Sequence, residues 1–288
     1  MTELDYLIAR LIRSRNGKTS VNNPAIITLL TDFGLRDPYV GIMKGVILSL
    51  NPDARIIDIS HSVKAGSIIH GAGIIQETYI YFPEGTIHVV VVDPGVGSDR
   101  RPILVKTKDR FFIGPDNGLF WPVIKTNHHT EIIHLTDTRH FLPNISSTFH
   151  GRDIFAPVAG HVSLGVDPSK MGAVINDPVP LHFPSPEQKN DILSGQVMRV
   201  DRFGNLISNL HMKDIEGYSG IKPLIIETGR LIIRGLHNTY SEVGAGKVLA
   251  LIGSSGCLEI AVNQGRACDL AGIKPEDIIG TKVDIKKG

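Results

Sequence analysis

The sequence is poor in the features that mark membrane, metal-binding and nucleic-acid-binding proteins. Its 288 residues include two cysteines, Cys257 and Cys268, which form no CxxC pair and are too few for a zinc site without other ligands. No run of about 18 apolar residues is present, so no membrane-spanning helix is predicted. Thirty Lys and Arg residues against 29 Asp and Glu residues leave a net charge of +1. This balance lacks the basic excess typical of nucleic-acid partners.

The N-terminus has neither the apolar core nor the cleavage site of a signal peptide. Together with the few cysteines, which we interpret as free thiols in a reducing compartment, this predicts a cytoplasmic protein. No residue cluster requires a metal or cofactor, and none is expected. Residues 1–18 place apolar side chains at helical spacing, which predicts a short amphipathic helix packed on the protein itself or on another subunit. These side chains are Leu4, Leu7, Ile8, Leu11 and Ile12.

The first half of the chain alternates predicted strands with predicted helices. Strands are expected at Pro24–Leu30, Arg55–Ile59 and Thr86–Val92, and helices at Tyr39–Leu50 and Ser67–Tyr81. This alternation predicts βαβ units and a parallel-rich sheet, and the apolar run of the third strand suits burial on both faces. The prediction continues with a strand pair at Ile103–Lys106 and Arg110–Ile113 and a helix at Ile154–Val162 capped by Asp153.

The second half changes character after a proline-rich stretch, residues 177–190. Short strands and glycine turns then predict a smaller all-β domain, a barrel. The expected strands are Gly195–Val200, Leu206–Asn209, Leu224–Glu227, Leu231–Ile233, Lys247–Ile252 and Cys257–Val262. The predicted organisation is therefore an N-terminal extension (1–23), an α/β domain (24–176), a linker (177–190) and a β-barrel domain (191–288).

Two aspartates follow predicted strands of the α/β domain. In open parallel sheets, ligand sites form where strands end at their carboxyl edge. Asp32 follows the first strand, and Asp93 follows the third in the loop Asp93–Arg101, whose glycines allow close backbone approach to a ligand. Both residues have a plainer interpretation as turn or helix-cap aspartates.

Three further segments are candidate site elements. His150 stands between an aromatic residue and Gly151, just before a predicted helix. The segments Asp201–Asn205 and Gly253–Gly256 are either ordinary turns or ligand-binding loops. Walker, GxGxxG, HExxH and GxSxG motifs are absent, so phosphate-cradling, zinc-protease and serine-hydrolase elbow interpretations have no support.

Taken together and in order, six motifs resemble those of the S-adenosylmethionine hydroxide adenosyltransferase family, which is related to fluorinating and chlorinating enzymes acting on the same substrate. The resemblance runs from about Pro24 to the C-terminus. The motifs are Thr31-Asp32-Phe33-Gly34, the Asp93–Arg101 loop, Gly114-Pro115-Asp116-Asn117-Gly118, Phe149-His150-Gly151-Arg152-Asp153, Asp201–Asn205 and Ser254–Asn263.

The resemblance implies a Rossmann-like N-terminal domain, a C-terminal β-barrel and a homotrimer with active sites between subunits. It implies that Asp93, Arg100 and His150 ready a water for attack. Arg101 is adjacent, and only the count from Asp93 favours Arg100. His150 is suited to accept a proton near neutral pH. The halogenating relatives lack this set, so its presence favours water over halide.

The expected activity is therefore hydrolysis of S-adenosylmethionine to adenosine and methionine. Two alternatives stay open: a halogenase, and a non-catalytic sensor of S-adenosylmethionine or adenosine. By resemblance, Asp32 would bind the ribose hydroxyls, Phe203 would stack on adenine, and Asn205 would bind a polar edge of the ligand. The others would bind its methionine part or lie at nearby positions. These other substrate-binding positions are Asp37, Asp201, Ser254, Glu259 and the backbone of Val262.

Overall fold

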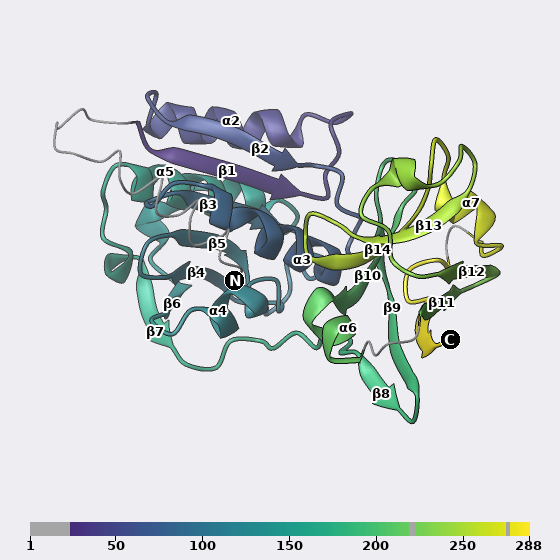
Figure 1. The fold of residues 1–288 in the computed structure, drawn as a ribbon. Helices are drawn as coiled ribbons and strands as arrows, with labels where there is room; N and C mark the ends of the chain where they lie inside the picture. The colour runs from purple at the N-terminus through teal and green to yellow at the C-terminus, as the bar shows by residue number, and fades with distance from the viewer. Residues whose placement is uncertain (1–23, 219–222, 275–276) are drawn as a thin grey trace, which may run out of the picture.

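The chain folds around two sheets (Figure 1). The computed structural model describes residues 24–218, 223–274 and 277–288. The helix predicted for residues 1–18 lies outside these ranges. An N-terminal sheet carries helices on its faces, and a C-terminal sheet made mostly of strands and turns stands beside it. Within the described ranges, no helix has the length and apolarity needed to cross a membrane.

The N-terminal sheet has seven strands in the order β2-β1-β3-β5-β4-β6-β7. The neighbours β2, β1, β3 and β5 run parallel, whereas β4, β6 and β7 pair antiparallel. All five strands predicted in this half are confirmed, and β6 and β7 are additional. The bounds are β1 Ile26–Thr31, β2 Arg55–Ser60, β3 Ile87–Val91, β4 Pro102–Lys106, β5 Phe111–Pro115, β6 Glu131–Leu135 and β7 Gly172–Ile175.

Helices cover both faces of this sheet, which gives three layers. Side chains alternate along β3: Val89 and Val91 pack in one core, and Val90 and Val92 pack in the other. This period of two explains the continuous apolar run of the strand, because both of its faces are buried. The first core lies under α2 (Tyr39–Leu50) and α5 (Ala156–Ser163), the second under α3 (Ile68–Thr78) and α4 (Trp121–Thr126).

The helix predicted at 154–162 begins differently from the expectation. Residues Gly151–Phe155 form a π-helical turn, and α5 follows directly. Asp153 is therefore not a helix cap. It is fully buried, and its carboxylate accepts a hydrogen bond from the backbone N–H of Ser146 at 2.8 Å. The wider turn lets Asp153 hold the loop that precedes it, a use of π-turns that is common near functional sites.

The C-terminal sheet has eight strands in the order β12-β11-β15-β9-β10-β14-β13, with β8 paired to β9. Its end strands β12 and β13 contact each other, so the sheet nearly closes into a barrel. All six predicted strands are present, but α6 (Met212–Tyr218) and α7 (Ala267–Leu270) show that the region is not built of strands alone. The bounds are β8 Glu187–Lys189, β9 Ile192–Val200, β10 Leu206–His211, β11 Leu224–Thr228, β12 Leu231–Arg234, β13 Val248–Ile252, β14 Cys257–Val262 and β15 Lys282–Lys287.

Polar contacts join the two sheets. Arg199 on β9 donates a hydrogen bond to Glu77 on α3, with 3.0 Å between Nη2 and Oε2. The side-chain amide of Asn209 on β10 donates to the backbone carbonyl of Pro184 at 2.7 Å. The proline-rich segment is thus held against the C-terminal sheet, and β9 against the N-terminal helices.

Candidate active site

The two strand-end aspartates lie at the same edge of the N-terminal sheet. Thr31 pairs with Val91 at the ends of the parallel strands β1 and β3, so Asp32 and Asp93 follow neighbouring strand ends. The half-buried carboxylate of Asp32 accepts a hydrogen bond from the backbone N–H of Gly66 at 2.8 Å. Asp37, the other predicted acid of this region, is exposed in the loop before α2.

Asp93, Arg100 and His150 form one cluster at this edge, with the Asp93 and Arg100 side chains largely buried and His150 half-buried. The Nε of Arg100 donates to both carboxylate oxygens of Asp93, at 3.0 and 2.9 Å, and its Nη2 also donates to Oδ2. The same Nη2 lies 2.6 Å from Nδ1 of His150. The side chains of Arg100 and Asp93 are 8% and 4% exposed, so water screens this pair little. The structure brings together the three residues predicted as catalytic.

The position of the His150 proton follows from its partner. Arginine is always a donor, so Nδ1 of His150 accepts, and the neutral ring carries its proton on Nε2. Burial first, and then the charge of Arg100, lower the pKa of His150 below its ordinary value, against the opposing effects of Asp93 and Asp153. His150 is therefore a neutral imidazole near pH 7.

One donor of the cluster remains free. The Nη1 of Arg100 is buried and has no hydrogen-bond partner among the described residues. A buried N–H without a partner is costly, so such groups are commonly satisfied by a ligand or water. The cluster thus retains a positively charged donor that no described residue satisfies.

Arg101 takes a different direction from Arg100. Its Nε donates to Asp116 at 2.9 Å, and its Nη1 donates to Asp177 at 2.9 Å. Asp116 also accepts a hydrogen bond from the backbone N–H of Val179. Arg101 therefore fastens the start of the proline-rich segment to the N-terminal sheet, and Arg100 alone joins the cluster.

Close packing of two loops holds the cluster in place. Gly97 has a φ of +78°, and a Cβ atom at this position would overlap the backbone oxygen of Ser147. Glycine is needed there both for its backbone conformation and for the close approach. On the other side, the ring of Phe149 packs edge-on against Phe33 and Tyr39, with centroids 5.9 and 5.1 Å away. These contacts place His150 beside the strand ends.

A cavity of about 460 Å³ opens in the C-terminal sheet. Four predicted binding residues line it, namely Asp201, Phe203, Ser254 and Glu259. The ring of Phe203 is 73% exposed and therefore has a free face. The full lining is Arg199, Asp201, Phe203, Ile207, Asn238, Tyr240, Leu251, Ile252, Gly253, Ser254, Ser255 and Glu259.

Hydrogen bonds within the cavity wall order its acids. Asn205 donates to Asp201 through both its backbone N–H and its side-chain amide, each at 2.9 Å. The hydroxyl of Tyr240 donates to Glu259 at 2.5 Å. Burial raises the pKa of Glu259, although the Tyr240 hydrogen bond opposes this, and burial together with Glu259 raises the pKa of Tyr240 to about 12. Gly253 leaves room for the Glu259 carboxylate, which a Cβ would approach to 2.6 Å.

Two predicted binding residues of the C-terminal region do not line the cavity. Asn205 lies behind Asp201, and the side chain of Val262 is buried in the barrel core, with its carbonyl accepting from Gly265. Sequence analysis missed three polar lining residues, Arg199, Asn238 and Tyr240. Arg199 had a usable signal, because it precedes Asp201 by two positions on a strand and so shares its face. Asn238 and Tyr240 had none, since they come from the irregular segment between β12 and β13, in which Tyr240 begins a short 3-10 turn.

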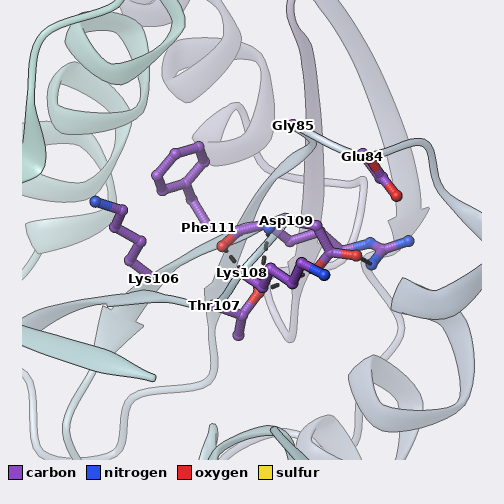
Figure 2. Close-up of a pocket in the computed structure, with 8 residues that line it drawn as sticks. Glu84, Gly85, Lys106, Thr107, Lys108, Asp109 and Phe111 are labelled. Carbon is purple, nitrogen blue, oxygen red and sulfur yellow. Dashed lines mark hydrogen bonds and ion pairs between the residues drawn. The ribbon is translucent and has the colours of Figure 1, made fainter. Parts of the chain in front are cut away.

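A second hollow lies away from the cluster, at the opposite edge of the N-terminal sheet. Figure 2 shows its lining around the turn between β4 and β5, and the hollow measures about 350 Å³. This turn lies at the amino ends of β3 and β5, whereas Asp93 follows the carboxyl end of β3. The lining is Glu84, Gly85, Lys106, Thr107, Lys108, Asp109, Arg110 and Phe111.

Known proteins resemble this chain over most of its length. The chain is 34% identical over 254 residues to a protein of Salinispora tropica named (R)-S-adenosyl-L-methionine hydrolase, covering 87% of this chain and 95% of that one. It is 26% identical over 274 residues to a fluorinase of Actinoplanes sp., covering 84% and 92%. An uncharacterized conserved protein of Thermotoga maritima has a similar crystal structure, with a TM-score of 0.83 and 34% identity over 91% of this chain and 100% of that one.

Two domain-family models match this chain, one on each side of the proline-rich segment. Residues 27–172 match the SAM hydroxide adenosyltransferase N-terminal domain, and residues 195–280 match the C-terminal domain. The chain belongs to the SAM hydroxide adenosyltransferase family.

Proposed function

We propose that this protein hydrolyses S-adenosylmethionine to adenosine and methionine. The observation that carries the proposal is the cluster of Asp93, Arg100 and His150 at the carboxyl edge of the sheet, with one arginine donor left free. Family membership and the relatives named hydrolases support it.

The reaction needs an oriented oxygen nucleophile and little else. A bond forms between the water oxygen and C5′ of the ribose, and the C5′–S bond breaks. The electron pair of that bond goes to sulfur, which turns the sulfonium into the neutral thioether of methionine. One proton leaves the attacking water. Since the leaving group departs neutral, no acid is required, and catalysis depends on in-line positioning and on hydroxide character in the water.

The cluster geometry suggests one role for each residue. The free Nη1 of Arg100 donates to the attacking oxygen and stabilises its developing negative charge. Asp93 has lone pairs beyond those that Arg100 engages and receives the proton. His150 holds the guanidinium through Nδ1, and its Nε2 already carries a proton, so in this proposal it orients Arg100 rather than acting as the base.

The other predicted residues bind the substrate. Asp32 accepts hydrogen bonds from the ribose diol, and the free face of Phe203 stacks on adenine. Asn205 lies behind Asp201 and orients its carboxylate toward a polar edge of the ligand. Asp37 and Asp201 bind the methionine ammonium, and Ser254 lies near the methionine carboxylate. Glu259 and the Val262 backbone make further contacts with the ligand.

We further propose a homotrimer whose sites lie between the N-terminal sheet of one subunit and the C-terminal cavity of the next. The split of the candidate residues supports this, because the cavity lining comes wholly from the C-terminal region and the cluster wholly from the N-terminal one. In this proposal the N-terminal region is a Rossmann-like domain spanning residues 24–176, and residues 191–288 form the barrel domain. Location in the cytoplasm stays a prediction from the sequence.

The first experiment is incubation of purified protein with S-adenosylmethionine in halide-free, ¹⁸O-labelled water, followed by mass spectrometry. Adenosine carrying the label at its 5′-oxygen is expected, because water attacks C5′. Parallel reactions with added chloride or fluoride test for halogenation, and a 5′-halo-adenosine would contradict the hydrolase proposal. Bound ligand without any turnover would point instead to a sensor.

A further inference from the structure

A chain of polar contacts runs from the surface of α2 to the first turn of the candidate site. Lys44 Nζ lies 2.6 Å from Asp58 Oδ2, and Asp58 Oδ1 lies 3.1 Å from His61 Nε2. On its other side, His61 Nδ1 lies 2.8 Å from the hydroxyl of Thr31. That hydroxyl accepts a hydrogen bond from the backbone N–H of Phe33 at 3.2 Å. None of the proposed catalytic or binding steps uses these side chains.

The partners in this series of contacts indicate where each proton lies. The Nε2 contact of His61 with Asp58 is an ion-pair contact rather than a well-aligned hydrogen bond, and a carboxylate there favours the N–H on Nε2. Nδ1 is then the acceptor, and the Thr31 hydroxyl donates to it. Burial would raise the pKa of Asp58, but the hydrogen bond from Lys44 and the close contact with His61 hold it below its ordinary value. The chain is therefore anchored by an ionised carboxylate.

Thr31, His61 and Asp58 supply the hydroxyl, imidazole and carboxylate of a hydrolytic triad. Unlike in such a triad, the hydroxyl is not accessible to a substrate. Thr31 is fully buried, and its oxygen already accepts from Phe33. A nucleophilic hydroxyl must reach the substrate, so this one is unsuited to attack. The contacts point to a structural effect on neighbouring groups.

The neighbour that they reach is Asp32. The segment from His61 to Gly66 wraps the turn that carries it: Gly34 N–H donates to the His61 carbonyl at 2.8 Å, and Gly66 N–H donates to the Asp32 carboxylate at 2.8 Å. The His61 ring is 4% exposed and sits inside this wrap. Thr31 stands one residue before Asp32. Its hydroxyl is thus held by the His61 ring, which is in turn held by Asp58.

We propose that His61 is a positioning residue for recognition of the ribose diol, acting through Thr31 to hold Asp32 in the geometry that accepts two hydroxyls. This inference rests on the proposed function, and in particular on Asp32 as the ribose ligand. Binding groups are effective when surrounding contacts lock them in advance, and small displacements lose much of the effect. His61 touches neither substrate nor reacting atoms.

The test compares S-adenosylmethionine with its 2′,3′-dideoxy analogue, which lacks the diol. Thr31→Val removes the hydroxyl but keeps the shape of the buried β-branched side chain. We expect kcat/KM for S-adenosylmethionine to fall about ten- to a hundredfold. The value for the dideoxy analogue should stay unchanged, so that the preference for the diol collapses.

Two histidine variants separate positioning from simple loss of packing. The amide of His61→Asn falls near the position of Nδ1 and can still pair with Thr31, whereas the longer His61→Gln reaches the position of Nε2. His61→Asn is expected to keep most of the diol preference, and His61→Gln is expected to lose it.

The protein supplies a matched control on the same strand. Thr28 pairs with the buried His88 in the same way, with 2.7 Å between Oγ1 and Nδ1, three residues before Thr31. Thr28→Val removes an equivalent buried hydroxyl away from Asp32. It should lower the melting temperature but leave the diol preference intact.

The outcomes are distinguishable. An equal loss for both substrates in Thr31→Val, or a loss of preference in Thr28→Val, would overturn the positioning role in favour of general destabilisation. Wild-type protein that hydrolyses S-adenosylmethionine without preferring the diol would overturn it together with the role of Asp32, while the hydrolase proposal stands. Absence of any hydrolysis by wild type would instead contradict the proposed function.

Discussion

At the scale of single residues, the hydrogen-bond partner of a histidine decides which of its ring nitrogens carries the proton. His150 and His61 both use Nδ1 as an acceptor, the first from an arginine and the second from a threonine. In each case the partner, not the intrinsic basicity of imidazole, decides what the ring can do. A histidine in a motif therefore predicts a functional position but not a role.

Replacement of His150 distinguishes a positioning role from a base. We expect His150→Ala to lower kcat about 10²–10⁴-fold, a loss of the size found for catalytic acid–base groups, because Arg100 loses its partner. His150→Asn places an amide oxygen near the former Nδ1, and we expect it to restore at least tenfold of that loss, since each tenfold corresponds to about 1.4 kcal/mol. Steady-state kinetics on both variants gives the answer. Equal losses would favour His150 as the base.

The pH dependence follows from the lowered pKa of His150. Burial and Arg100 hold this pKa below the ordinary 6.5, so the neutral, arginine-accepting form persists to below pH 6.5. Protonation removes the acceptor and adds a positive charge beside Arg100. We therefore expect kcat/KM to fall as the pH decreases, about tenfold per unit below the pKa. This acidic decrease in the pH profile of kcat/KM should disappear in His150→Asn. An acid limb centred above pH 6.5 would contradict this assignment.

At the scale of elements, the loops rather than the strands carry the site. The strands and most helices were predictable because period-two and period-3.6 patterns are local in the sequence. Two of the missed strands have weak patterns: β15 carries four charged residues in six, and β7 has no fully buried residue. The π-turn before α5 was also missed, since its cause is a distant contact of Asp153 with Ser146.

Gly97 provides the test at this scale. Gly97→Ala places a Cβ against the Ser147 backbone at a positive φ, so we expect a loss of about 1–2 kcal/mol in unfolding free energy. Because this loop carries Arg100, kcat/KM should fall by at least tenfold even at temperatures where the variant stays folded. Denaturant unfolding and kinetics measure the two effects.

The control for that substitution is Gly73→Ala in α3, where a Cβ meets nothing within 4 Å. It should be neutral or stabilising by about 0.5–1 kcal/mol, because glycine disfavours the helix. Wild-type activity in Gly97→Ala would show that the loop contact does not position Arg100.

At the scale of the whole molecule, the candidate site has two halves. The cluster lies at the edge of one sheet and the cavity in the other. Arg199, which lines the cavity, joins the two regions by its hydrogen bond to Glu77 on α3. A symmetric oligomer with head-to-tail contacts brings such halves together between neighbours. This is the physical basis of the proposed trimer.

Subunit complementation tests the proposed sharing. Asp93→Asn and Phe203→Ala variants should each be nearly inactive alone. Mixed trimers formed by coexpression should regain about a quarter of wild-type activity, the random fraction of sites with two intact halves. Mass measurement in solution fixes the oligomeric state. Failure of the mixture to exceed either variant, with mixed trimers present, would mean that one subunit supplies both halves.

The sequence by itself determined the alternation of strands and helices, the barrel-like second region, and the strand-end placement of Asp32 and Asp93. It also carried the motifs that identify the family. These features depend on periodicity, turn chemistry and residue order, all of which act over a few residues.

Only the tertiary structure decided which arginine joins Asp93, which nitrogen of His150 is free and how the candidate site divides. Arg100 and His150 are separated by 50 positions in the sequence, and Thr31 and His61 by 30. Contacts across such separations depend on how strands pair and loops pack, and no local pattern encodes the direction of a hydrogen bond between them. The sequence positions of the candidate site residues can therefore be recognised from local patterns. The arrangement of protons among them is a property of the folded chain.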